Sequence, residues 1–127
     1  MLAIDAGADA LGFIFAPSER QISVEAAAAI ASRLPPFTVI FGVFADPLPH
    51  EIRRAQGAIP GLRLQFSGDE PPELCESLAN SAYLKAIHLG RPDGDDARWI
   101  AGGAEFTRVI PLFDAWHPSK RGGTGIT

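Results

Sequence analysis

An apolar segment that ends in a single aspartate, Arg108-Val-Ile-Pro-Leu-Phe-Asp114, is followed by a loop with two basic residues and three glycines, Ala115-Trp-His-Pro-Ser-Lys-Arg-Gly-Gly-Thr-Gly125. A carboxylate at the carboxyl end of a buried strand, next to a glycine-rich loop, is how α/β barrels place an acid beside a phosphate. The same residues also fit a simpler structure, in which Asp114 caps the next element and the glycines form a surface loop. The stretch predicts a buried strand and leaves two roles open for Asp114.

Upstream of this stretch, short apolar segments alternate with segments of helical character. The predicted strands span residues 10–16, 38–44, 62–66, 82–88 and 106–113, and the predicted helices span residues 1–8, 23–34, 46–55, 68–78 and 93–101. Strands that are separated by helices must run parallel, because each crossover returns the chain to the same end of the sheet. The pattern fits either an open doubly wound sheet or part of an eight-stranded barrel. No Gly-x-Gly-x-x-Gly follows the first strand, which argues against the nucleotide-binding open sheets.

Size, charge and cysteine content restrict the classes of partner. The chain has 127 residues, of which 46% are hydrophobic and 20% charged, as expected for one globular domain. The net charge of -4, without a basic cluster, argues against a nucleic-acid partner. A single cysteine, Cys75, excludes an internal disulfide and favours the cytoplasm. No apolar run is long enough to span a membrane, and the first residues do not form a signal peptide.

Six short motifs, taken in order, carry a resemblance to a known enzyme family. They are Asp5-Ala-Gly-Ala-Asp-Ala-Leu-Gly-Phe-Ile-Phe15, Ser18-Glu-Arg20, Gly42-Val-Phe44, Leu64-Gln-Phe-Ser-Gly-Asp-Glu70, Lys85-Ala-Ile87, and Phe113-Asp114 with Gly122-Gly-Thr-Gly125. In their order and spacing, over essentially the whole chain, the sequence resembles phosphoribosylanthranilate isomerase of tryptophan biosynthesis.

The resemblance implies an incomplete (β/α)8 TIM barrel, in which the five predicted strands are strands two to six of eight. The family's first strand carries a Lys-x-Cys-Gly motif, whose cysteine is the general base, and no such motif occurs in this chain. A complete barrel typically takes about 250 residues. We therefore expect residues 1–127 to form a single partial barrel domain, an internal fragment that is inactive by itself.

The resemblance also implies a reaction and a set of site residues. The reaction is the Amadori rearrangement of a phosphorylated small molecule, N-(5-phosphoribosyl)anthranilate, and it uses no cofactor. Asp114 matches the general acid, and Arg20 matches the arginine that faces the anthranilate carboxylate, which a guanidinium fork suits. Glycines let backbone N–H groups approach an anion closely, so the glycine loop matches the phosphate side of the site. The residues implied there are Gly122, Gly123, Thr124 and Gly125, and further candidates for substrate binding are Gln65, Lys85 and His88.

Two residues depart from the family pattern, and several alternatives stay open. Ser67 replaces a histidine that is common in the family, and His88 stands where an arginine is frequent. Lys85 could instead form a Schiff base, as in barrel aldolases, or serve an enzyme of the indole-glycerol-phosphate synthase type. A five-stranded open sheet could also be a binding module without enzymatic activity. The sequence leaves the oligomeric state open.

The remaining reactive side chains receive structural interpretations. Cys75 lies inside a predicted helix and is expected to be a small buried hydrophobe. Asp69 and Glu70 are expected to begin that helix, where acidic residues suit the helix dipole. The three histidines, His50, His88 and His117, lack the spacing of metal ligands.

Overall fold

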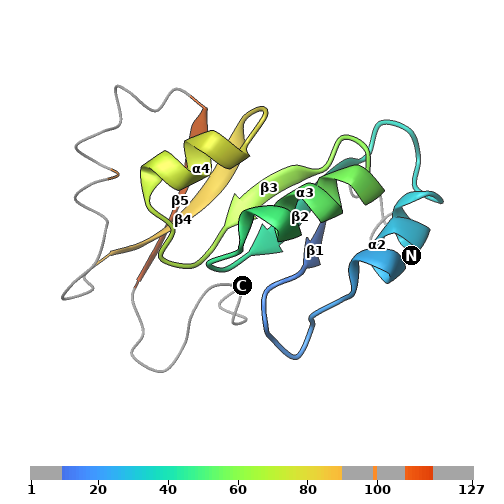
Figure 1. The fold of residues 1–127 in the computed structure, drawn as a ribbon, viewed down its shortest axis with the longest axis horizontal. Coiled ribbons are helices and arrows are strands. Elements are labelled where there is room, and N and C mark those ends of the chain that lie inside the picture. The colour runs from blue at the N-terminus through green and yellow to red at the C-terminus, as the bar shows by residue number, and fades with distance from the viewer. Residues whose placement is uncertain (1–9, 90–98, 100–107, 116–127) are drawn as a thin grey trace.

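The chain folds around a parallel five-stranded sheet in which every strand pairs with its neighbours in sequence. The computed structural model describes residues 10–89, Trp99 and residues 108–115. The strands are β1 (Ala10–Ile14), β2 (Val39–Phe44), β3 (Arg63–Phe66), β4 (Tyr83–Leu89) and β5 (Val109–Ala115), in the order β1-β2-β3-β4-β5 (Figure 1). Each pairing is parallel, so all carboxyl ends meet at one edge. The predicted fold class, an α/β sheet that corresponds to an incomplete barrel, is confirmed.

Three described helices connect the strands and pack on one side of the sheet. They are α2 (Val24–Ala31), α3 (Pro49–Ala58) and α4 (Pro72–Leu78), and in Figure 1 α3 lies in front of β2. The helix α2 begins as predicted, because Ser23 Oγ accepts a hydrogen bond from the Ala26 N–H at 3.1 Å. Within the described residues, no helix has the length and apolar character that a membrane crossing needs. The helices predicted at 1–8 and 93–101 lie outside the described residues, apart from Trp99.

The predicted starts of the second and third described helices were wrong. The helix α3 begins at Pro49, three residues after the predicted start at residue 46, and follows Leu48, whose N–H donates to Glu51 Oε1 at 2.9 Å. Asp46 instead adopts the left-handed conformation, with φ 50°. The helix also continues past its predicted end at residue 55, to Ala58. The helix α4 begins at Pro72, so Asp69 and Glu70 precede it.

The hydrophobic core lies between the sheet and these helices. Phe44, Phe66 and Lys85 are neighbours across β2, β3 and β4 and therefore share the helix-facing side. Phe66 and Tyr83 are fully buried, and their rings meet edge to face with centroids 5.7 Å apart. Removing a buried phenylalanine side chain of this kind costs about 3–5 kcal/mol.

The opposite side of the sheet is apolar but open among the described residues. Ile110 and Leu112 on β5 are 50% and 40% exposed, and Val39 on β2 is exposed as well. All three occupy positions that alternate with the helix-facing residues. Parallel sheets are ordinarily covered on both faces, and in a barrel the second face forms the packed interior. This face of the sheet therefore corresponds to the inside of a barrel.

Candidate active site at the carboxyl edge of the sheet

The candidate site lies where the carboxyl ends of four strands meet. Asp46 follows β2, the segment Ser67–Glu70 follows β3, and His88 lies near the end of β4. Asp114, predicted from the opening stretch, is the penultimate residue of β5 and pairs in register with His88. The fold thus brings two sequence-predicted residues, His88 and Asp114, to adjacent positions on neighbouring strands. Their 26-residue separation in sequence gave no local signal of this pairing.

A short polar chain links β3 to His88. Gln65 Nε2 donates to Ser67 Oγ at 3.2 Å, and the Ser67 N–H donates to the Phe44 carbonyl at 2.8 Å. His88 Nε2 lies 3.3 Å from the Ser67 carbonyl oxygen. A carbonyl oxygen only accepts hydrogen bonds, so Nε2 carries the proton in this contact and Nδ1 is the other polar atom of the ring. The two positions that depart from the family pattern, Ser67 and His88, are therefore in contact with each other.

A fully buried ion pair between Lys85 and Glu70 adjoins these hydrogen bonds at Gly68, the residue after Ser67. Lys85 Nζ donates to Glu70 Oε1 at 2.7 Å, and the two side chains are 3% and 0% exposed. The same ammonium donates to the Gly68 carbonyl at 2.8 Å, and Glu70 accepts from the backbone N–H groups of Asp46 and Gly68. Removing two charges from water is costly unless each is paired and hydrogen-bonded, and here both conditions are met. Sequence reasoning missed this function of Glu70 because its partners lie 15 and 24 residues away.

The geometry of Lys85 does not fit a Schiff-base nucleophile. Its side chain leaves β4 on the helix-facing side, where Nζ also lies 5.8 Å from the centre of the Trp99 ring. A carbonyl substrate that approached the carboxyl edge would meet Gly68 and Glu70 before it met the ammonium. The aldolase-type alternative therefore loses its key residue, and Lys85 takes a structural position instead.

The close approach of two loops explains a glycine in the predicted motif. Asp46 Oδ1 accepts a hydrogen bond from the Asp69 N–H at 2.9 Å, which ties the end of β2 to the end of β3. A Cβ atom on Gly68 would lie 2.6 Å from Asp46 Oδ2 and 2.7 Å from the Asp46 backbone nitrogen. Only glycine fits at this contact without displacing the backbone.

Arg20 lies in the exposed loop that follows β1. The Arg20 N–H donates to Ser18 Oγ at 3.1 Å, and Gln21 Nε2 donates to the Phe15 carbonyl at 3.1 Å. These bonds fold the loop back over the end of its own strand, so Arg20 belongs to the same edge of the sheet as the other candidates. The predicted phosphate loop, Gly122, Gly123, Thr124 and Gly125, lies outside the described residues.

Cys75 is unsuited to act as a thiolate base. As predicted, it is a fully buried residue in the middle of a helix, α4. Burial raises the pKa of its thiol far above the ordinary value, because the surrounding core stabilises the neutral form. No other cysteine occurs in the chain. Among the described residues no group of three His, Cys, Asp or Glu side chains is placed to hold a metal ion.

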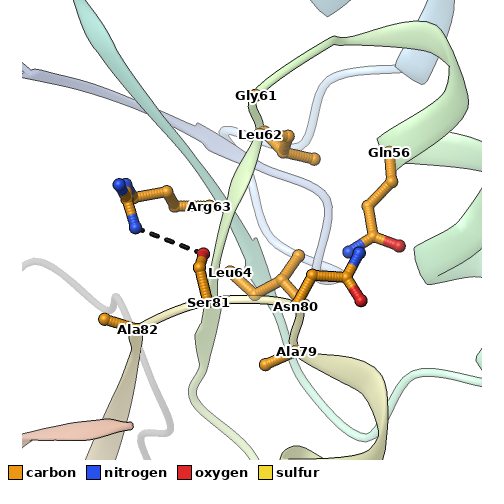
Figure 2. Close-up of a pocket in the computed structure, with 9 residues that line it drawn as sticks. All are labelled: Gln56, Gly61, Leu62, Arg63, Leu64, Ala79, Asn80, Ser81 and Ala82. Atoms are coloured by element: carbon orange, nitrogen blue, oxygen red, sulfur yellow. Dashed lines mark hydrogen bonds between the residues drawn. The ribbon is translucent and has the colours of Figure 1, made fainter.

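Among the described residues, one hollow lies far from the candidate site and another lies beside the loop that holds Arg20. One, of about 290 Å³, opens at the amino ends of β3 and β4, where Arg63 Nη1 donates to Ser81 Oγ at 3.2 Å and the side chains of Gln56 and Asn80 point toward each other (Figure 2). It lies at the edge of the sheet opposite the candidate site. The other, of about 230 Å³, lies between the first turns of α2 and α3, over the rings of Phe15 and Phe44. Neither hollow could be predicted from the sequence, because residues of turns and loops line much of both.

Comparisons with known proteins agree on one family. The family model described as N-(5'phosphoribosyl)anthranilate (PRA) isomerase matches residues 1–127. The N-(5'-phosphoribosyl)anthranilate isomerase of Moorella thermoacetica is 41% identical over 127 residues, which cover 99% of this chain and 54% of that protein. The homologue of Methylibium petroleiphilum is 49% identical over 88 residues, 68% of this chain and 41% of its own. The chain thus spans about half the length of the curated relatives it matches.

Solved structures give the same result. The crystal structure of phosphoribosyl anthranilate isomerase from Thermus thermophilus is 38% identical and superposes with a TM-score of 0.73, covering 92% of this chain and 56% of the other. A phosphoribosyl anthranilate isomerase in complex with reduced 1-(o-carboxyphenylamino)-1-deoxyribulose 5-phosphate superposes with a TM-score of 0.72 at 32% identity, covering 90% and 57%. From its sequence, its sheet and the residues at the carboxyl edge, the chain belongs to the phosphoribosylanthranilate isomerase family.

Proposed function

We propose that this chain contributes to a phosphoribosylanthranilate isomerase of tryptophan biosynthesis, which converts N-(5-phosphoribosyl)anthranilate to 1-(o-carboxyphenylamino)-1-deoxyribulose 5-phosphate. The observation that carries the proposal is the pairing of Asp114 with His88 at the carboxyl edge of a sheet of this family. That edge is where barrels of this architecture hold their active sites. A solved family member binds a reduced form of the product named here.

Asp114 is proposed as the general acid of the first step. It donates a proton to the ring oxygen of the ribose, the ring C–O bond breaks, and the nitrogen lone pair forms an iminium ion. A base then removes the proton from the adjacent carbon, and the resulting enolamine tautomerises to the ketose amine. One group must hold a proton while the other is free of it, which requires two sites with different proton affinities.

The base of the second step is not a cysteine of this chain. Cys75, the one cysteine present, is buried and its pKa is raised, so it does not form a thiolate near neutral pH. A thiolate base would therefore have to come from outside these 127 residues.

Arg20 and the glycine loop are proposed to bind the two anionic ends of the substrate. The Arg20 guanidinium would pair with the anthranilate carboxylate in a bidentate geometry. The backbone N–H groups of residues 122–125 would hold the phosphate. Gln65 and His88 complete the proposed site on the sheet. A cytoplasmic location is proposed as well, because the buried Cys75 is a free thiol.

The test is the activity of an Asp114→Asn variant, made in a chimaera in which these 127 residues replace the matching residues of the Moorella thermoacetica relative, so that the rest of the barrel is present. Turnover of N-(5-phosphoribosyl)anthranilate is followed by the change in anthranilate fluorescence, and growth without tryptophan is scored in a bacterial strain that lacks the isomerase. Loss of a general acid lowers kcat by about 10²–10⁴-fold. Glu73→Gln, which removes an exposed carboxylate in the first turn of α4, is the matched control and should retain the activity of the unmodified protein.

Two results would argue against the proposal. Equal rates for Asp114→Asn and Glu73→Gln would remove Asp114 from the mechanism. Turnover by the 127 residues alone would mean that a base other than a thiolate serves the reaction.

A further inference from the structure

We propose that the buried Glu70–Lys85 ion pair is a positioning device, which orients His88 through the single peptide bond between Ser67 and Gly68. The role of His88 in turnover rests on the proposed function, but the orientation of its ring does not. Lys85 has no evident role at the reacting atoms, and in this proposal it helps to hold the Ser67–Gly68 peptide in place.

The pair links the segment after β3 to the end of β2 and to the middle of β4, in addition to the pairing between these strands. Glu70 precedes α4, and its carboxylate accepts from Lys85 on β4 at 2.7 Å and from the Asp46 N–H at the end of β2 at 2.7 Å. It also accepts from the Gly68 N–H, at 3.0 Å and 3.2 Å to its two oxygens. Because both charges are buried, neither can be satisfied by water if the geometry changes. The arrangement therefore resists displacement.

Both polar groups of the Gly68 backbone are used by this pair. Its N–H donates to Glu70 and its carbonyl accepts from Lys85 at 2.8 Å. The Gly68 N–H and the Ser67 carbonyl belong to the same peptide unit, which is planar, and in its trans form these two groups point in opposite directions. A peptide whose N–H is directed at Glu70 therefore directs its carbonyl away from the core. That carbonyl is the partner of His88 Nε2, at 3.3 Å.

The consequence is a defined chemical state of the imidazole. His88 donates through Nε2 to Ser67, and Nδ1 remains as the acceptor of the neutral ring or the second donor of the charged ring. His88 occupies the position on β4 that is in register with Asp114 on β5, so this ring belongs to the strand position next to the proposed general acid. Glu70 and Lys85 are thus positioning residues that act through Ser67 and His88.

The test measures hydrogen exchange of the His88 Nε2–H by nuclear magnetic resonance in protein with 15N-labelled histidine, with the signal assigned by its loss in His88→Gln. Glu70→Asp keeps the charge but shortens the reach, and Glu70→Gln with Lys85→Met removes both charges at similar volume. Each should speed the exchange at least about fivefold, the factor that corresponds to a hydrogen bond of about 1 kcal/mol. Far-UV circular dichroism establishes that each variant is folded.

The matched control is Cys75→Ala, which weakens the core beside the pair without touching the loop. It should leave the exchange of the His88 proton unchanged. The proposal is overturned if both Glu70 variants exchange at the original rate, or if Cys75→Ala speeds the exchange as much as they do.

A kinetic cycle separates this inference from the proposed function. If Glu70 acts through His88, then Glu70→Asp should lower kcat/KM in the unmodified protein and have no further effect in His88→Gln. Equal effects in both backgrounds would contradict action through His88. These rates are measured in the chimaera with the Moorella thermoacetica relative. Absence of turnover in every folded form, the unmodified chimaera included, would reject the proposed function, and the exchange rates would still decide whether the pair positions the ring.

Discussion

Replacing Gly68 by alanine tests the close approach of the β2 and β3 ends. The added methyl group would lie 2.7 Å from the Asp46 backbone nitrogen, whereas ordinary van der Waals contacts are 3.4–4 Å. One of the two loops must therefore move by more than half an ångström. The Asp46 carboxylate can swing aside, because the residue is exposed, but the backbone nitrogen cannot. Its N–H is held by Glu70 at 2.7 Å.

The cost follows from what this movement breaks. Overpacking of a well-packed site costs about 1–3 kcal/mol. Weakening a hydrogen bond to a buried carboxylate costs about 1.5–3 kcal/mol. The two losses overlap, since the same displacement causes both, and we expect a decrease of about 3 kcal/mol in the free energy of unfolding. Domains of this size are stable by about 5–15 kcal/mol, so the variant should still fold.

Urea unfolding followed by far-UV circular dichroism measures the effect, and the midpoint should fall by at least about 1 M. Gly57→Ala is the matched control: nothing lies within 4 Å of its added methyl group inside α3, so it should gain about 0.5–1 kcal/mol. Adding Asp46→Gly to Gly68→Ala removes the carboxylate but not the backbone nitrogen, and should recover only part of the loss. Full stability of Gly68→Ala, or full recovery by Asp46→Gly, would refute the reasoning.

Three further predictions concern buried groups. Lys85→Met leaves Glu70 as an unpaired buried carboxylate and should cost about 3–5 kcal/mol in urea unfolding, most of which Glu70→Gln in the same chain should restore. Tyr83→Phe removes the hydrogen bond from the phenol to Glu76 and should cost about 1.5–3 kcal/mol, with m unchanged. Burial raises the pKa of the Cys75 thiol, so above about pH 8.5 the unfolded chain releases a proton that the folded chain keeps. The free energy of unfolding should therefore fall with rising pH, by up to about 1.4 kcal/mol per unit, and Cys75→Ala should remove this slope between about pH 8.5 and 10.

The strands could be predicted from the sequence, because burial on both faces of a parallel sheet leaves a continuous apolar run. The segment 38–44 differs from β2 (Val39–Phe44) by one residue. Helix starts were harder where an acidic residue preceded the helix. Asp46 and Glu70 both looked like local helix signals, yet they bond to groups 23 and 24 residues away. Local propensity does not reveal such partners.

Part of the candidate site could likewise be predicted from the sequence and part could not. Asp114 at the end of a strand was visible in the sequence, because an apolar run ends in a carboxylate. Its pairing with His88 was not, since the register of two strands depends on contacts along their whole length. The contact between His88 and Ser67 is a tertiary contact as well, between neighbouring strands 21 residues apart in sequence.

The buried ion pair also has a consequence for how the chain reaches its folded state. Glu70 cannot leave water until the end of β2 and the lysine of β4 are both in place, since an isolated buried charge is unstable. The central three strands should therefore open and close as one cooperative unit, whose backbone amides exchange with solvent at a common rate. β1 carries no group of this network, so its amides should exchange faster than those of the central three strands.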